Sequence, residues 1–343
     1  MSEITLTIDG QRVVAWPGAT VLDVARVGGR YIPTLCWDPL LKPFGACRLC
    51  VVEIDGLKGL PASCTTPAED GMVVRTGGES VAAARRLALD LIIADHPLEC
   101  LVCRSNQRCE LQKVAARLGY TGSSLRPTRR DIPLDSSNPF YDRDLAKCIL
   151  CGRCVRACDE IRGVHAIQFV NRSFELKIGT AMDRPVVDSN CESCGQCVDT
   201  CPTGALVDRR YVGLPDREVP SICPYCGCGC GVVLQVKDER LVGAIADREH
   251  PVSRGSLCVK GRYGLDFVHH PDRLSKPLVR RDGRLVETSW DEALDLVADR
   301  LVEHRGRFAA LASAKCTNEE NYVFQKLARG VMGTNNVDHC ARI

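Results

Sequence analysis

Two cysteine-rich runs lie close together near the middle of this sequence. The first is Cys148-Ile-Leu-Cys151-Gly-Arg-Cys154-Val-Arg-Ala-Cys158, and the second is Cys191-Glu-Ser-Cys194-Gly-Gln-Cys197-Val-Asp-Thr-Cys201-Pro202. Both have the spacing C-x2-C-x2-C-x3-C. Structural zinc sites typically use two separated pairs of ligands and do not need the third and fourth Cys of such a run. The spacing therefore favours iron–sulfur clusters over zinc.

The two runs resemble those of bacterial two-cluster ferredoxins. In that family each run gives three thiolates to one [4Fe-4S] cluster and its fourth thiolate to the other. One departure is Asp159, which stands where Pro usually follows the fourth Cys. The resemblance implies one cluster held by Cys148, Cys151, Cys154 and Cys201, and a second held by Cys158, Cys191, Cys194 and Cys197.

Composition indicates a protein that binds metal in a reducing compartment. The chain has 343 residues, 22 of them Cys, and a net charge of +2, which does not indicate nucleic-acid binding. The N-terminus has no basic and apolar export signal, and no apolar run is long enough to cross a bilayer. We expect a cytoplasmic protein without a membrane span, whose thiols bind iron and do not form disulfides.

The N-terminal residues predict a small sheet that carries four thiols. Residues 4–8 and 12–16 form the strands of a predicted hairpin, and Thr20 caps a predicted helix through Arg26. Four Cys follow on loops, and their spread suits a [2Fe-2S] cluster better than a zinc finger. The spacing resembles the N-terminal domain shared by the large iron–sulfur subunit of complex I, iron-only hydrogenases and NAD-linked formate dehydrogenases. The expected ligands are Cys36, Cys47, Cys50 and Cys64.

A second predicted site follows a helix over residues 78–95. We expect its apolar stripe to contain Val81, Ala84, Leu87 or Ala88, and Leu91. The next motif is H-x3-C-x2-C-x5-C, in which His96 is the only nearby side chain able to complete a set of three Cys. The same motif follows the [2Fe-2S] domain in the families just named, and this resemblance implies a [4Fe-4S] cluster held by His96, Cys100, Cys103 and Cys109.

The segments around the ferredoxin-like runs carry weaker signals. Residues 110–118 predict a short helix, and residues 174–178 predict a strand. Residues 121–146 are rich in Ser, Pro, Arg and Asp without periodicity, which predicts a linker. We expect its arginines, Arg126, Arg129 and Arg130, to form a solvated face.

A further group of thiols begins at Cys223 with the spacing C-x2-C-x3-C-x27-C, which predicts one more [4Fe-4S] cluster. Two strands, 232–236 and 241–245, are expected between its ligands. This region resembles the N-terminal cluster domain of molybdopterin oxidoreductases, and in that family a Lys two residues past the last Cys lies between cluster and pterin. The expected ligands are Cys223, Cys226, Cys230 and Cys258, with Lys260 as the bridge and Cys228 as a free thiol that could exchange roles with a neighbour.

The C-terminal residues predict a capped amphipathic helix over 289–304, with Leu294, Val297, Ala298 and Leu301 on one face, and then a strand over 308–312. The segments 313–322 and 333–342 resemble the start of the formate dehydrogenase catalytic domain. In that family the residue after the stretch matching Cys340 to Ile343 is the Cys or selenocysteine that ligates molybdenum or tungsten. We expect the gene to continue past Ile343, with UGA for selenocysteine as its next codon.

Together these features predict an α+β, multidomain iron–sulfur protein with one [2Fe-2S] and four [4Fe-4S] clusters. The expected domains are 1–77 ([2Fe-2S]), 78–120 (His/Cys3 cluster), 121–140 (linker), 141–210 (ferredoxin pair), 216–275 (molybdopterin-oxidoreductase cluster) and 285–343 (incomplete start of the catalytic domain). The chain is identified as the N-terminal portion of an NAD-linked formate dehydrogenase alpha subunit, which alone would be inactive.

The resemblance implies further components of the full protein. Bis-molybdopterin guanine dinucleotide with molybdenum or tungsten is expected only in the full-length chain. Flavin- and NAD-binding iron–sulfur subunits are the expected partners, or else a hydrogenase or ferredoxin. The alternative is a stand-alone multi-cluster subunit of a hydrogenase-like or complex I-like assembly.

Overall fold

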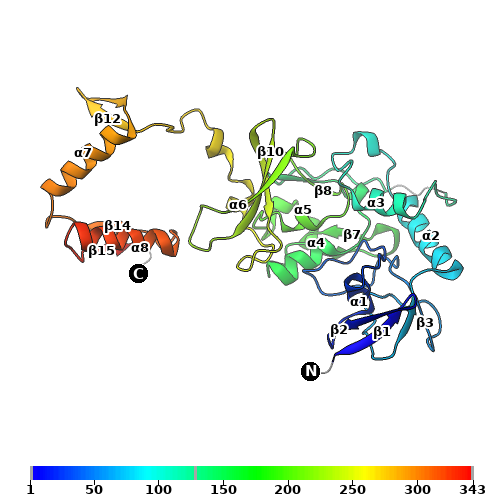
Figure 1. Ribbon diagram of the computed structural model, residues 1–343. Helices are drawn as coiled ribbons and strands as arrows, with labels where there is room; N and C mark the ends of the chain where they lie inside the picture. Colours follow the sequence, from blue (N-terminus) through cyan, green and yellow to red (C-terminus); the bar gives the residue numbers. More distant parts are fainter. Residues whose placement is uncertain (1–2, 127–129, 341–343) are drawn as a thin grey trace. The chain divides into compact units, whose positions relative to one another are not determined.

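The computed structural model describes residues 3–126 and 130–340 (Figure 1). The chain divides into two compact units, Met1–Leu214 and Pro215–Ile343, and each is described by itself. Of the sequence expectations, Arg129 and the residues 341–343 lie outside the described part of the chain.

The first unit begins with a four-stranded sheet whose strand order is β2-β1-β4-β3. β1 is antiparallel to β2 and parallel to β4, so the predicted hairpin is confirmed. Thr20 and Asp23 cap the predicted helix reciprocally, each side chain accepting a hydrogen bond from the other's backbone N–H. The elements are β1 (Ile4–Ile8), β2 (Gln11–Ala15), α1 (Val21–Val27), β3 (Glu53–Ile54) and β4 (Val73–Arg75).

Two helices follow the sheet, α2 (Glu79–Ala94) and α3 (Glu110–Arg117), as predicted. The predicted apolar stripe of α2 is wrong in its leucines, because Leu87 and Leu91 are 56% and 59% exposed. The buried face instead runs at four-residue spacing through Val81, Arg85, Leu89 and Ile93. Leu89 and Ile93 pack with Leu35 and Leu49 from the loops of the sheet domain, and this contact decides which face of α2 is buried.

The ferredoxin-like region is built from two antiparallel strand pairs and two short helices. β5 pairs with β8, and β6 with β7, around a small core that includes Leu145, Val155 and Ile178. The strands and helices are β5 (Tyr141–Arg143), α4 (Arg153–Arg156), β6 (Gln168–Val170), β7 (Lys177–Gly179), α5 (Gln196–Thr200) and β8 (Leu206–Asp208). The π-helix η3 (Ala157–Ile161) continues α4, and the short 3-10 helices are η2 (Leu145–Lys147), η4 (Ser173–Glu175), η5 (Ala181–Asp183) and η6 (Val186–Asp188). A further 3-10 helix, η1 (Cys100–Val102), lies earlier, between α2 and α3.

Two expectations for this region need correction. The strand predicted over 174–178 begins only at Lys177, because residues 173–175 form a short helical turn. Arg130 does not belong to a solvated face, since its side chain is 10% exposed and pairs with Asp95. Its guanidinium also donates to the carbonyl oxygens of Cys148 and Leu176. Arg126 is exposed, as expected.

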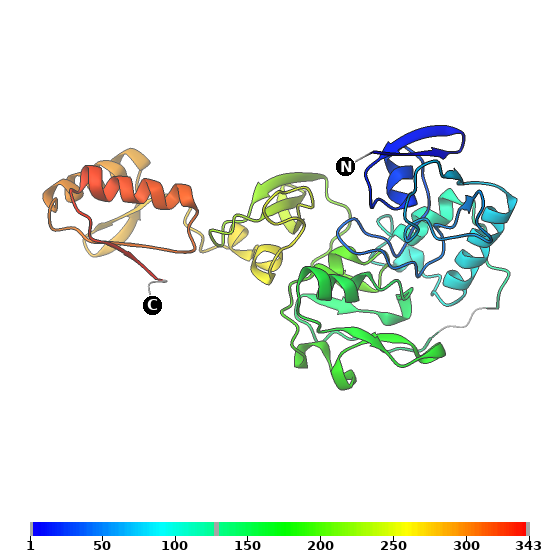
Figure 2. The same ribbon diagram turned by 90° about the horizontal axis from the view of Figure 1, so that it is seen from below.

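The second unit contains a three-stranded antiparallel sheet of order β11-β10-β9, followed by further pairs of strands and helices (Figure 2). The two predicted strands correspond to β10 and β11, whereas β9 was not expected. The elements are β9 (Arg217–Ile222), β10 (Gly231–Lys237), β11 (Arg240–Ala246), α6 (Val259–Tyr263), η7 (Asp266–His269), β12 (Leu278–Arg281), β13 (Arg284–Glu287), α7 (Trp290–Glu303), β14 (Ala310–Ala312), α8 (Asn318–Lys326), η8 (Leu327–Val331) and β15 (Val337–His339).

The helix predicted over 289–304 is confirmed as α7, with Ser289 as its N-cap. Its apolar face does not pack against a core, because Leu294 and Val297 are both more than half exposed. The predicted strand is β14, which pairs in parallel with β15. Within the described residues, no helix combines the length and the apolar character that crossing a membrane requires.

The packing of α2 yields a direct test. Leu89→Ala should lower the free energy of unfolding by about 2–5 kcal/mol, because Leu89 is fully buried and its loss leaves a cavity. Leu87→Ala, a change of the same size on the exposed face, should alter it by no more than about 0.5 kcal/mol. Urea unfolding followed by circular dichroism measures both. Equal losses would contradict burial of the Leu89 face of the helix.

Candidate metal centres

The first group of thiols lies on loops of the sheet domain. Cys36, Cys50 and Cys64 are almost completely buried, and the Sγ atoms of Cys50 and Cys64 are 3.4 Å apart. The backbone N–H of Cys47 donates to Cys36 Sγ, and that of Leu35 donates to Cys47 Sγ. The loop that carries Cys47 turns at Gly45, whose φ of +69° is accessible to glycine at little cost.

Within this group the thiols differ in acidity. Hydrogen bonding with Cys47 and Cys64 lowers the pKa of Cys36, and hydrogen bonding with Cys64 lowers the pKa of Cys50. The same hydrogen bonds raise the pKa of Cys47 and Cys64. Thiolates are the form of Cys that binds metal, so a cation would displace the remaining thiol protons.

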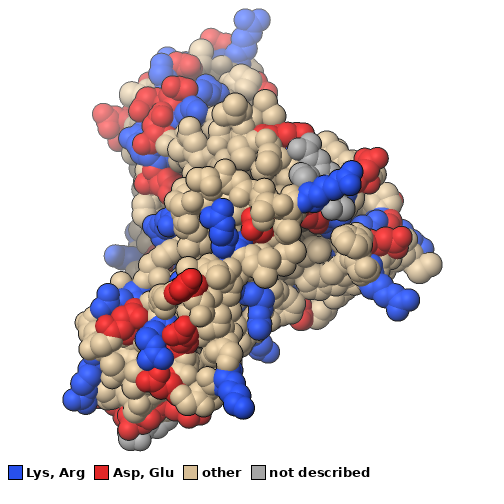
Figure 3. All heavy atoms as spheres, turned by 90° about the vertical axis from the view of Figure 1, so that its right-hand side faces the viewer, with Lys and Arg blue, Asp and Glu red and all other residues tan. Residues whose placement is uncertain are grey.

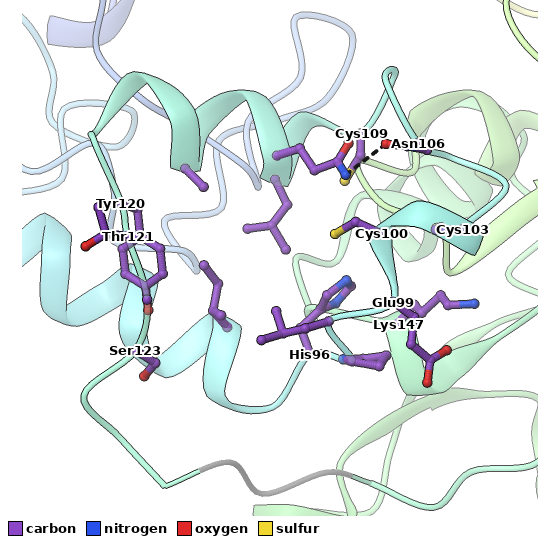
Figure 4. Close-up of a pocket in the computed structure, with 18 residues that line it drawn as sticks. His96, Glu99, Cys100, Cys103, Asn106, Cys109, Tyr120, Thr121, Ser123 and Lys147 are labelled. Carbon is purple, nitrogen blue, oxygen red and sulfur yellow. Dashed lines mark hydrogen bonds between the residues drawn. The ribbon is translucent and has the colours of Figure 1, made fainter.

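The second group surrounds a cavity of about 290 Å³ between α2, α3 and the ferredoxin-like region. His96, Cys100, Cys103 and Cys109 all line it, and Figure 4 shows side chains of this set around the common space. The Nδ1 atom of His96 is buried and has no hydrogen-bond partner. Burial and the positive charge of Lys147 lower the pKa of His96 to about 4, so its imidazole is neutral at pH 7. A neutral imidazole with a free, buried nitrogen is suited to ligation.

The third group contains the eight thiols of the two ferredoxin-like runs. They form two sets, and each set combines three thiols of one run with the fourth thiol of the other. Cys148, Cys151, Cys154 and Cys201 line one narrow cavity. Burial raises the pKa of Cys197, and the nearby charges of Cys194, Cys191 and Cys158 raise it further. The structure therefore brings each fourth Cys to the opposite run.

The two runs also share a backbone conformation. Leu150 and Ser193 both have a φ of +53°, and each donates its N–H to the Sγ atom two residues earlier at 3.4 Å. The next glycine of each run, Gly152 and Gly195, is also left-handed and precedes a helix. In both runs this turn directs a backbone N–H group at sulfur, and such donors favour binding of an anionic cluster.

The His96 group and the ferredoxin-like region meet closely. A Cβ atom on Gly204 would lie 2.7 Å from Cys103 Sγ, so only glycine allows this approach without a shift. Cys109 Sγ is 3.6 Å from the carbonyl oxygen of Pro202, which also accepts the N–H of Glu110.

In the second unit, Cys223 and Cys230 are joined through the backbone, since Cys223 N–H donates to the Cys230 carbonyl. Burial raises the pKa of Cys223, and the charges of Cys258, Cys226 and Cys228 add to this effect. Cys228 is exposed, with its Sγ 3.6 Å from that of Cys230. Lys260 is exposed on α6, and its Nζ lies 5.9 Å from the centre of the Tyr225 ring.

Arginines near the thiols were missed by the sequence interpretation. Arg130 binds the Cys148 carbonyl, Arg153 pairs with Glu110 and binds the Thr200 carbonyl, and Arg156 binds the Cys36 carbonyl. The sequence did contain a signal for two of them, because Arg153 and Arg156 lie between the cysteines of the first run and must therefore be close to its thiols. The described residues contain no three His, Cys, Asp or Glu side chains placed to hold a single metal ion. A cluster differs from such an ion because it distributes its ligands over several irons.

Five family models match successive parts of the chain and confirm the predicted fold class. They are a 2Fe-2S iron–sulfur cluster binding domain (1–79), the NADH-ubiquinone oxidoreductase-G iron–sulfur binding region (85–124), the ferredoxin-like domain of NADH-quinone oxidoreductase subunit 3 (138–207), the molybdopterin oxidoreductase Fe4S4 domain (216–270) and molybdopterin oxidoreductase (273–343).

Curated relatives match 99% of the chain. The G 2 subunit of NADH-quinone oxidoreductase from Rhizobium meliloti is 40% identical, the NADPH-Fe(3+) oxidoreductase subunit alpha of Geobacter sulfurreducens is 37% identical, and a Staphylococcus aureus protein named "Putative formate dehydrogenase SA2102" is 31% identical. The chain spans about 40% of the length of these relatives.

A solved structure is also similar. In the crystal structure of an NAD+-reducing [NiFe]-hydrogenase, one chain is 35% identical with a TM-score of 0.57, and the match covers 60% of this chain and 87% of that one. The chain is therefore a multi-cluster iron–sulfur electron-transfer region of the type found in molybdopterin oxidoreductases and in the G subunits of NADH-quinone oxidoreductase.

Proposed function

We propose that this chain is the electron-relay portion of a formate dehydrogenase alpha subunit. It would pass electrons between a metal-pterin formate/CO2 site and an NAD-reducing partner through five iron–sulfur clusters. The observation that carries the proposal is the presence of ferredoxin-type cluster domains and of both molybdopterin oxidoreductase matches in one chain. The similarity to the Staphylococcus aureus protein supports formate as the substrate.

The ligand sets of this proposal are those expected from the sequence, and the domain boundaries are also retained. Clusters supply one-electron redox chemistry, while the protein sets their potential through ligand type, charge and burial. The unpartnered Nδ1 of His96, the thiol acidities around Cys36 and the repeated turns at Cys148 and Cys191 support these sets. The position of Lys260 two residues after Cys258, in the first turn of α6, supports its proposed place between cluster and pterin.

Contacts in the first unit support the ferredoxin-like region as the junction between the other two sites. The His96 group approaches it through Cys103 and Gly204. The [2Fe-2S] loop meets it through Arg156, whose guanidinium donates to the carbonyl oxygens of Cys36 and Lys42. We therefore propose a branched relay, in which the Cys36 group lies beside the ferredoxin pair and not only beyond the His96 group.

Exposed apolar side chains near His96 support docking of a redox partner. Leu98, Leu101 and Val102 are each more than 60% exposed, next to the proposed ligands Cys100 and Cys103. Figure 3 shows one face of the molecule, on which charged side chains are interspersed with areas of other residues. We propose that a flavin- and NAD-binding iron–sulfur subunit is the partner. Apolar side chains at the centre of such a contact would exclude water between the two proteins.

A second candidate is a subunit of a hydrogenase-like or complex I-like assembly. It is favoured by the hydrogenase chain, of which 87% is covered, and by the 40% identity to the NADH-quinone oxidoreductase relative. This candidate requires no formate site.

The two candidates differ in their electron donor. The polypeptide encoded by the complete gene, produced with molybdenum or tungsten and with its partners, should reduce viologen dye in the presence of formate. The second candidate instead predicts reduction with NADH and none with formate. Anaerobic dye reduction with formate, NADH or hydrogen as the donor distinguishes them. Dye reduction by NADH alone would contradict the formate proposal.

The proposed imidazole ligand can be tested by iron content. His96→Ala should remove about one to four iron atoms from the reconstituted chain, because the iron that loses its protein ligand dissociates alone or with the whole cluster. His165→Ala is the matched control, since His165 is exposed and belongs to no proposed ligand set. Iron and acid-labile sulfide analysis measures the loss. Unchanged iron content in His96→Ala would refute the assignment.

The role of Cys228 is tested by a neighbouring pair of substitutions. Cys230→Ser should cost about four iron atoms, whereas Cys228→Ser should cost none, because the position of Cys228 lies outside the proposed ligand spacing. Iron analysis together with EPR of the dithionite-reduced chain measures the difference. The reverse result would assign Cys228 as the ligand.

A further inference from the structure

Arg85 is an unusual residue for the buried face of a helix. It lies in α2, outside the sheet domain that carries the first thiol group, and only 8% of its surface is exposed. Its guanidinium points back to that domain and donates to the carbonyl oxygen of Val51 at 2.8 Å. Val51 directly follows the proposed ligand Cys50. The side chain therefore brings a positive charge against the loop that carries Cys50.

This charge has no carboxylate partner among the ion pairs of the described residues. Glu53, close by in sequence, pairs instead with Arg75. The Nε atom of Arg85 is also buried without a hydrogen-bond partner. Burial lowers the pKa of Arg85, and the thiolate of Cys50 is the group that opposes this effect most. An uncompensated buried charge is costly, so the anionic thiol group is the natural counter-charge.

We propose that Arg85 is a potential-setting residue, whose fixed positive charge raises the reduction potential of the [2Fe-2S] centre at Cys36, Cys47, Cys50 and Cys64. The inference rests on the cluster assignment of the proposed function. Reduction adds one electron to the centre and so increases its negative charge. A nearby guanidinium stabilises the reduced form more than the oxidised form, and no proton has to move.

Arg156 approaches the same loops from another element, but it is less suited to a test. It binds the carbonyl oxygens of Cys36 and Lys42, and it also stands two residues from Cys154 and Cys158. Its replacement would perturb two sites at once. Arg85 has no proposed ligand within two residues, so its replacement reports on one site.

The experiment compares Arg85→Gln with Arg85→Lys and with the control Arg86→Gln in the reconstituted full chain. Gln keeps a donor for the Val51 carbonyl but removes the charge, whereas Lys keeps the charge. Arg86 is the next residue and is exposed, so Arg86→Gln removes an equal charge in contact with water. Anaerobic EPR-monitored redox titration gives the midpoint potential of the [2Fe-2S] signal in each variant.

We expect Arg85→Gln to reduce the ratio of reduced to oxidised centre at a fixed potential by about tenfold, which is about 59 mV for a one-electron couple. Arg85→Lys and Arg86→Gln should stay close to wild type. Loss of the centre in the Gln variant with retention in the Lys variant would also support charge compensation.

Other outcomes separate the failure of this inference from failure of the proposed function. If the wild-type chain has no [2Fe-2S] signal, the cluster assignment itself is wrong. If the signal is present but Arg85→Gln leaves its potential unchanged, only the role of Arg85 is overturned. Loss of the centre from both the Gln and the Lys variants would make Arg85 a structural residue and would likewise overturn the inference.

Discussion

Burial of negative charge is the constraint on which the first unit depends. Three groups of thiols lie largely inside the protein, and thiolates in such surroundings need positive charge or N–H donors. The chain supplies both. Left-handed turns direct N–H groups at sulfur, and guanidinium groups bind the carbonyl oxygens beside the thiols. Several of these arginines come from a different segment than the thiols, so the same contacts also hold the domains together.

Much of the fold and of the candidate sites could be predicted from sequence because the information is local. Cysteine spacing within each run fixes which thiols can meet, and the hairpin, the Thr20 cap and the Ser289 cap all depend on neighbouring residues. The grouping of Cys158 with the second run, and of Cys201 with the first, was predicted from the resemblance to bacterial ferredoxins. Spacing alone does not specify which run the fourth Cys joins.

The errors arose where tertiary contacts decide the structure. The buried face of α2 is set by contacts with Leu35 and Leu49, which are distant in sequence from Leu89 and Ile93. A stripe that contains Arg85 also lacks the continuous apolar pattern expected of a buried helix face. Arg130 was assigned to a solvated linker because its partners, Cys148 and Leu176, are distant in sequence. In both cases the missed residue is a buried arginine that donates a hydrogen bond to a backbone carbonyl beside a group of thiols, and this contact can be recognised only in the folded structure.

The exchange of ligands between the two ferredoxin-like runs has a consequence for biogenesis. As the chain emerges from the ribosome, the proposed set around Cys36 is complete once Cys64 has appeared. In the proposed assignment, neither set of the pair can close before the second run has been made, because one includes Cys201 and the other includes Cys191, Cys194 and Cys197. The same assignment would let the first domain bind iron earlier in translation than the ferredoxin pair.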